Sequence, residues 1–220
     1  MEKFIEFIFG SLLALFPIVD PIGSVPIFLM LTATASERVR RQFAWRTTFN
    51  VLVVLIVFLL VGGWILRFFG ISLEVVRIAG GIVVFHAAWQ TMNAKPKLSN
   101  QDNQVAIHSI EQHEDIAFMP MTIPMLAGPG SIAVTLGISA QAGRELSLDT
   151  TMNLVAAAIA IAILSLIIYV CLRSSSYLLK ILSERGISAM SRILGLFILA
   201  IGVQLILNGI ADWLSLIGLI

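Results

Sequence analysis

Six long apolar runs, separated by short segments that carry most of the charge, divide the sequence. A run of about 20 mostly apolar residues is long enough to cross the hydrocarbon core of a bilayer. Because lipid offers no hydrogen-bond partners to the backbone, such a run crosses it as a helix. The sequence therefore predicts an all-α polytopic membrane protein with six transmembrane helices. The runs are Phe4–Thr34, Thr47–Leu66, Ile78–Ala94, Ile116–Gly143, Met152–Leu172 and Ile193–Ala211.

The composition supports a single transmembrane domain over residues 1–220. Hydrophobic residues make up 58% of the chain and charged residues 12%, whereas soluble domains have about 25% charged residues. The net charge of +1 gives no reason to expect nucleic acid as a partner. The sequence has no HExxH, GxSxG or phosphate-loop motif, so we expect neither an enzyme nor a cofactor. His108 and His113 lie in a polar segment that is more typical of a solvated loop than of a metal site.

Lys and Arg residues are unevenly distributed between the connecting segments. Ten of the 14 follow the first, third and fifth runs, within residues 35–46, 95–115 and 173–192. Loops rich in Lys and Arg stay on the cytoplasmic side of a membrane. We therefore expect both termini to face away from the cytoplasm.

The two halves of the sequence match each other. At a constant offset of 103 residues, Pro17, Pro21 and Pro26 fall on Pro120, Pro124 and Pro129. The same offset aligns residues 47–50 with 150–153, and an offset of 115 aligns residues 77–80 with 192–195. This pattern predicts two repeats, about 1–94 and about 116–220, joined by a polar loop over 95–115. Each repeat has three spans, an odd number, so the second is inverted relative to the first, as in many secondary transporters.

The matched prolines predict that helices 1 and 4 are broken in the middle of the membrane. Proline removes a backbone donor and clashes with the preceding turn. The half-helix that follows a break exposes unpaired N–H groups and a partial positive charge, which attract a carboxylate. Carbonyl groups at the ends of the first half-helices, around Val19 and Ile123, accept an ammonium group. Together the two breaks suit a small zwitterion.

Several residues at the breaks are candidates for binding such a substrate. Asp20 has two interpretations that stay open: it binds a substrate ammonium or carries a proton, or it only caps a helix beside Pro21. Asn50 and Asn153 occupy matched positions, where interhelical hydrogen bonding competes with substrate contact as an explanation. The candidate substrate-binding residues are Asp20, Pro21, Gly23, Ser24, Val25, Pro26, Asn50, Pro124, Gly128, Pro129, Gly130, Ser131 and Asn153.

Two stretches resemble the signature motifs of the MarC/SnatA family. They are Asp20–Phe28 in the first run and Pro124–Ile132 in the fourth, and residues 77–81 and 202–210 also resemble that family. The resemblance implies a six-span protein of the bacterial or archaeal inner membrane. With the orientation that the Lys and Arg residues predict, both termini would lie on the periplasmic side of that membrane. Some members of the family are described as transporters of small neutral amino acids. Some carry Asn in place of the acid of the first motif, which leaves a proton-carrying role for Asp20 open.

The leading hypothesis is a secondary transporter of glycine, alanine and serine-like amino acids, with H⁺ or Na⁺ as candidate coupling ions. The alternatives are a channel or leak pathway and a non-transporting membrane protein of the same family. A channel needs a continuous polar stripe, whereas these spans are mostly aliphatic. The expected partners are the lipid bilayer and the substrate, and a homo-oligomer is compatible with the sequence. The sequence leaves the direction of transport open.

Overall fold

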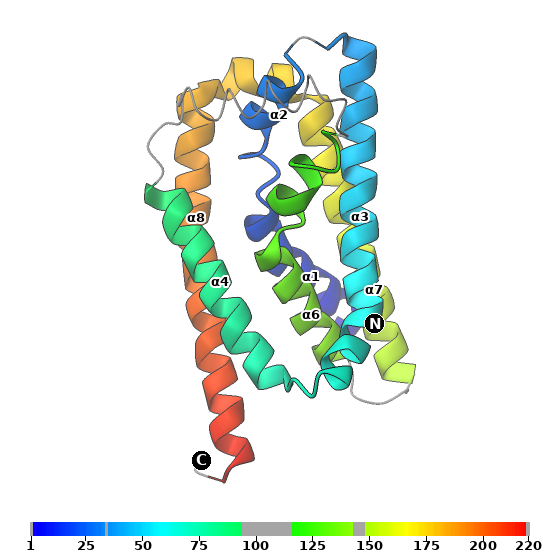
Figure 1. The fold of residues 1–220 in the computed structure, drawn as a ribbon, viewed down its shortest axis with the longest axis vertical. Coiled ribbons are helices and arrows are strands. Elements are labelled where there is room, and N and C mark those ends of the chain that lie inside the picture. The colour runs from blue at the N-terminus through cyan, green and yellow to red at the C-terminus, as the bar shows by residue number, and fades with distance from the viewer. Residues whose placement is uncertain (1, 34, 94–115, 143–147, 219–220) are drawn as a thin grey trace.

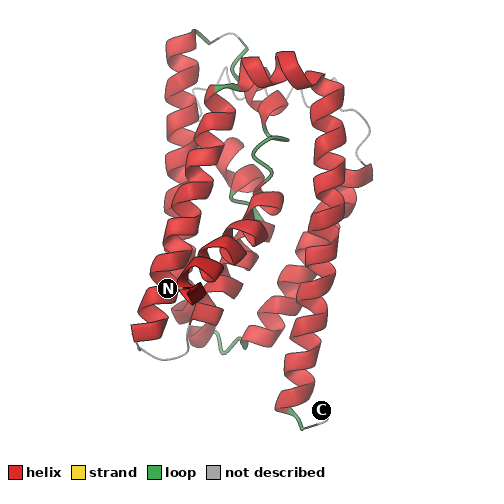
Figure 2. Ribbon diagram, turned by 180° about the vertical axis from the view of Figure 1, so that it is seen from behind, coloured by secondary structure: helices red, strands yellow, loops and turns green. Residues whose placement is uncertain are grey.

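The computed structural model describes residues 2–33, 35–93, 116–142 and 148–218, which form helices joined by short links (Figures 1 and 2). No strand occurs in these ranges, so the expected all-α class is confirmed for the described part of the chain. The elements in chain order are α1 (Glu2–Val19), α2 (Val25–Leu31), α3 (Glu37–Phe68), α4 (Leu73–Asn93), the π-helix η1 (Met121–Leu126), α6 (Pro129–Ala142), α7 (Leu148–Arg173) and α8 (Ser175–Leu216).

Four helices are long and apolar enough to cross a membrane among the described residues: Glu37–Phe68, Leu73–Asn93, Thr150–Arg173 and Arg185–Leu216. They correspond to the second, third, fifth and sixth apolar runs. The first and fourth runs each form two shorter elements, α1 with α2 and η1 with α6. The helix interruptions expected in these two runs are therefore present.

Two helices are longer than the apolar runs predict. Helix α3 begins ten residues before Thr47, because Ser36 caps it by accepting a hydrogen bond from the Val39 N–H and Glu37 complements the helix dipole. Helix α8 includes residues 175–182, which lie across one end of the bundle (Figure 1). A kink at Ser183, with φ 55° and ψ 165°, separates this part from the long span.

The helices form two groups on either side of the breaks. Figure 1 shows α3 and α7 on one side and α4 and α8 on the other, with α2, η1 and the start of α6 between them. Helices α4 and α8 pack closely through glycines: a Cβ on Gly81 would lie 2.7 Å from the Gly202 carbonyl oxygen. Small residues of this kind let membrane helices approach each other without a bulky interface.

Neighbouring segments run in alternating directions through the bundle. In Figure 1, α1–α2, α4 and α7 run toward one end, and α3, η1–α6 and the long part of α8 run toward the other. The chain therefore begins and finishes in the same half of the molecule. The core between the groups is aliphatic, with Leu15, Leu55, Leu126 and Ile161 fully buried.

Candidate functional site

The first break is a compact turn held together by Asp20. This residue has a positive φ of 44°, and its Oδ1 accepts a hydrogen bond from the Gly23 N–H at 3.0 Å. The Ser24 N–H donates to the Asp20 carbonyl at 3.2 Å, and the Ser24 hydroxyl donates to the Pro21 carbonyl at 2.8 Å. Asp and Asn tolerate this backbone conformation better than most other residues. The arrangement gives Asp20 a capping role.

The N–H groups expected to bind substrate in the first break already have acceptors. Those of Gly23 and Ser24 bind Asp20, and that of Val25 donates to the Ile22 carbonyl at 3.1 Å. A carboxylate that used these donors would have to displace the bonds within the turn. In this conformation the first break therefore offers an anion fewer donors than the sequence suggested. Pro26 lies in the first turn of α2, where its missing N–H costs nothing.

The second break combines a kink inside the π-helix η1 with the two residues, 127 and 128, that separate η1 from α6. Ile123, with φ −116° and ψ 125°, interrupts the helical backbone before Pro124. The Ser131 hydroxyl donates back into the break, to the carbonyls of Leu126 at 3.1 Å and Gly128 at 3.0 Å. A side chain at Gly128 would overlap the Pro124 carbonyl oxygen, so this position requires glycine. The Ser131 side chain thus stabilises the break.

The start of α6 differs from the start of α2 because the backbone N–H groups at the start of α6 are free to bind a ligand. Pro129 is the first residue of α6, as expected. Within the described part of the chain, the N–H groups of Gly128, Gly130 and Ser131 have no hydrogen-bond acceptor. Unpaired N–H groups at a helix N-terminus form a site suited to an anion such as a carboxylate. The second break therefore retains the donors that the first has used internally.

The two breaks adjoin each other through Gly130. A Cβ built on Gly130 would lie 3.3 Å from Cγ2 of Ile18, in the last turn of α1, and 3.5 Å from Cγ2 of Val84 in α4. Figure 1 shows both interruptions near the middle of the bundle's height. The start of α6 thus packs against the helix end that leads into Asp20.

The structure adds polar groups at the breaks that sequence reasoning had not selected. Ser191 of α8 is one: a Cβ on Gly23 would lie 2.6 Å from its buried Oγ. Thr47 and Thr48 of α3 are two more, because their buried hydroxyls have no partner among the described residues. The Thr47 carbonyl lies 3.5 Å from the Thr122 hydroxyl in η1. The repeat match over residues 47–50 was the signal that could have identified both threonines.

The matched asparagines lie in different environments. Asn153 donates to the carbonyl of Ala142, the last residue of α6, at 3.3 Å. At 1.5 Å per residue, this end of the helix is roughly 20 Å from Pro129, so Asn153 is not at the break. Asn50 lies half-buried on α3, one turn beyond Thr47, so it is closer to the second break than Asn153 is. The segment with His108 and His113 lies outside the described residues.

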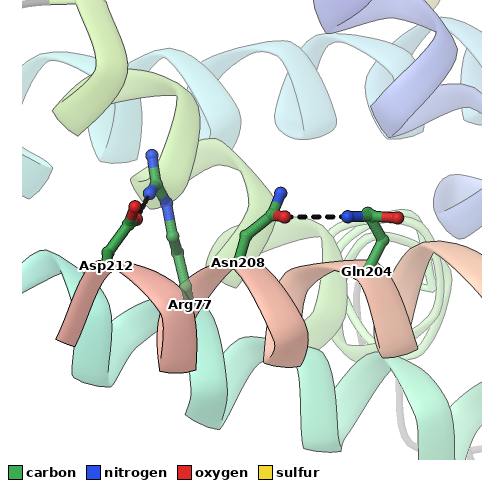
Figure 3. A network of polar contacts seen from close by, with 4 residues as sticks. All are labelled: Arg77, Gln204, Asn208 and Asp212. Atoms are coloured by element: carbon green, nitrogen blue, oxygen red, sulfur yellow. Dashed lines mark hydrogen bonds and ion pairs between the residues drawn. The ribbon is translucent and has the colours of Figure 1, made fainter. Parts of the chain in front are cut away.

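A row of polar side chains follows the paired helices α4 and α8 (Figure 3). Arg77 of α4 forms an ion pair with Asp212 of α8, and Gln204 donates a hydrogen bond to Asn208 Oδ1 at 2.7 Å. Figure 3 shows all four side chains on the same side of the two helices. The Arg77 side chain is only 16% exposed, so removing Asp212 would leave a largely buried charge.

Comparison with known proteins gives consistent results. Residues 5–214 match the family described as "MarC family integral membrane protein". A UPF0056 membrane protein of Methanocaldococcus jannaschii is 34% identical over 90% of this chain and 92% of its own. The UPF0056 membrane protein YhcE of Escherichia coli is 30% identical over 96% and 95%, respectively. The UPF0056 inner membrane protein MarC of Salmonella paratyphi A is 28% identical over 92% and 93%.

No solved structure matches the chain. The family assignment therefore depends on sequence, and it covers almost the full length, including both breaks and the row of polar residues on α4 and α8. The resemblance found in the two proline motifs is confirmed. The chain belongs to the MarC family of integral membrane proteins.

Proposed function

We propose that this protein is a secondary transporter that moves small neutral amino acids, such as glycine, alanine and serine, across the bacterial or archaeal inner membrane. The observation that carries the proposal is the meeting of two interrupted helices, with open N–H donors at the start of α6. Substrate sites in many transporters lie between broken helices, near the middle of the membrane.

The chemistry of the breaks favours an amino acid over other solutes. The N–H groups of Gly130 and Ser131 would hold the substrate carboxylate. Carbonyl groups at the end of α1, around Val19, would attract the ammonium group, because the C-terminal end of a helix carries a partial negative charge. Contact between Gly130 and Ile18 leaves little room for a substrate side chain, which favours glycine and alanine.

The proposal includes two inverted repeats that move against each other. The offset of 103 between the proline sets supports it, as does the opposite direction of α1–α2 and η1–α6 in Figure 1. In transporters built this way, one repeat rocks against the other and exposes the central site to each side in turn. Arginines lie near the start of α3 and the end of α7. They favour a cytoplasmic location for the end of the bundle that carries them, with both chain termini on the outer side.

Counterflow of labelled glycine in proteoliposomes tests the function. Vesicles with the purified protein, loaded with unlabelled glycine, should accumulate labelled glycine faster than protein-free vesicles. Unlabelled alanine should compete, whereas leucine and lysine should not. The absence of both counterflow and glycine binding in a folded preparation would refute the proposal. Ion currents through single proteins in planar bilayers would instead favour a channel.

A further inference from the structure

A pocket of about 360 Å³ lies where α3 begins and α7 ends. Figure 1 shows these two helix termini at the same end of the bundle. The pocket is separate from the two breaks and is formed by the first turns of α3 and the corner between α7 and α8. Its polar lining includes Glu37, Arg40, Arg41, Arg173, Ser174 and Ser176.

The pocket has an excess of positive charge. Three of its side chains are arginines and one is a glutamate. The exposed pair Arg173–Glu37, at 3.6 Å, is too solvated to neutralise the site strongly. Arg41 makes no ion pair or hydrogen bond with the described part of the chain. Guanidinium groups in this arrangement suit an anion with several oxygen atoms, such as a phosphate.

Arg40 lines the pocket, and two hydrogen bonds hold its side chain in place. Its Nη1 donates to the Ser176 hydroxyl and its Nη2 to the Thr32 carbonyl, both at 3.2 Å. These bonds connect α3 with the end of α2 and the start of α8. The Nε atom of Arg40 is buried and has no acceptor among the described residues. Arg40 is therefore held in place while one of its donors stays open.

Two aromatic residues show how deep the pocket lies relative to the membrane. Trp45 of α3 and Tyr169 of α7 meet edge to face, with their ring centroids 5.9 Å apart. Trp45 lies one turn from Arg41, and Tyr169 lies one turn from Arg173. Because Trp and Tyr gather at the membrane–water interface, both arginines lie at the level of lipid headgroups.

The surface beyond the aromatic pair is suited to acyl chains. On α3, Phe49 is 51% exposed, and on α7, Leu166 and Val170 are 62% and 53% exposed. Phe49 lies one turn from Trp45 and Leu166 about one turn from Tyr169, both toward the middle of the bundle, and Val170 is adjacent to Tyr169. A ligand that spans both regions needs a phosphate at one end and hydrocarbon at the other.

We propose that this pocket binds the phosphate group of an anionic phospholipid, whose acyl chains lie along α3 and α7 beside Trp45 and Tyr169. The arginine bias in the sequence assigns this end to the cytoplasmic side. Basic pockets between membrane helices on that side bind anionic headgroups. The proposal does not depend on the transported substrate.

Lipid titration of the delipidated wild-type protein, followed by native mass spectrometry, tests the proposal. Phosphatidylglycerol and phosphatidylcholine with identical acyl chains should differ in affinity by about tenfold or more, in favour of phosphatidylglycerol. Equal affinity for the two lipids would overturn the proposal. Inorganic phosphate provides the other arm: displacement of phosphatidylglycerol by an equal concentration of phosphate would identify a site for soluble phosphate and overturn the lipid assignment.

Variants locate the binding to this pocket. The double variant Arg41→Gln with Arg173→Gln should lower phosphatidylglycerol affinity by about tenfold. Arg38→Gln is the matched control, because it removes a charge from the same first turns of α3 but does not line the pocket. It should change the affinity less than twofold. An unchanged double variant, or an equal loss in Arg38→Gln, would refute the site; if the double variant does not fold, the wild-type titrations decide.

Discussion

Replacement of Asp20 by alanine or asparagine separates the turn-forming role of this residue from a chemical one. Alanine removes the Oδ1 atom that accepts the Gly23 N–H and leaves a partly buried donor unpaired, at a cost of about 1–3 kcal/mol. It also places a less tolerant side chain at φ 44°, which adds about 1 kcal/mol. Asparagine keeps an acceptor oxygen and tolerates positive φ, so its cost should stay within about 0.5 kcal/mol.

Thermal unfolding in detergent measures these differences. For a chain of this size each kcal/mol corresponds to about 2–4 °C, so Asp20→Ala should lower the melting temperature by roughly 5–15 °C. Asp20→Asn should lower it by no more than about 2 °C. If both variants melt as the wild type does, or both lose the same stability, the capping role assigned to Asp20 is wrong.

Counterflow in the same variants then tests the chemical role. Asp20→Asn should retain glycine counterflow, because it preserves the turn and an acceptor oxygen. Loss of counterflow in this variant, at unchanged melting temperature, would show that the carboxylate itself is needed. The residue would then bind the ammonium group or carry a proton rather than only closing the turn.

Two further perturbations test the packing of α4 and α8. Gly202→Ala should destabilise the protein by about 1–3 kcal/mol in thermal unfolding, because its Cβ would lie 2.8 Å from the Phe85 backbone nitrogen. The control Gly137→Ala meets no atom within 4 Å and should be neutral or stabilising, so equal losses in both variants would contradict the argument. Asp212→Asn alone should destabilise the protein more than Asp212→Asn combined with Arg77→Gln. The single variant leaves the Arg77 side chain charged, largely buried and without its partner. A double-mutant cycle measures this difference, and strictly additive losses would argue against a functional ion pair.

Much of the fold follows from the sequence because lipid permits few solutions. Long charge-free runs must become helices, and the paired prolines interrupt two of them where expected, at residues 20–24 and before Pro129. The early start of α3 was not predicted from hydropathy, because half of residues 37–46 are charged. Its cap at Ser36 is a local signal that hydropathy does not measure.

The candidate site was only partly predictable for a different physical reason. Prolines and glycines mark where a helix breaks, but they do not say which N–H groups the broken chain satisfies by itself. Asp20 and Ile22 satisfy those of the first break, whereas the start of α6 stays open. Contacts such as that of Gly23 with Ser191 depend on tertiary packing between residues far apart in the chain. No local pattern reports them.

Binding of labelled glycine to purified wild-type protein and two glycine variants tests the central claim most directly. Gly130→Val places a branched side chain between α6 and Ile18, where the two breaks meet. Gly10→Val is the control, because its position on α1 is exposed and a Cβ there would have no atom within 4 Å. Wild type and Gly10→Val should bind glycine equally, and Gly130→Val should bind it at least about tenfold more weakly. Wild-type affinity in a folded Gly130→Val variant would contradict a substrate site at the paired breaks.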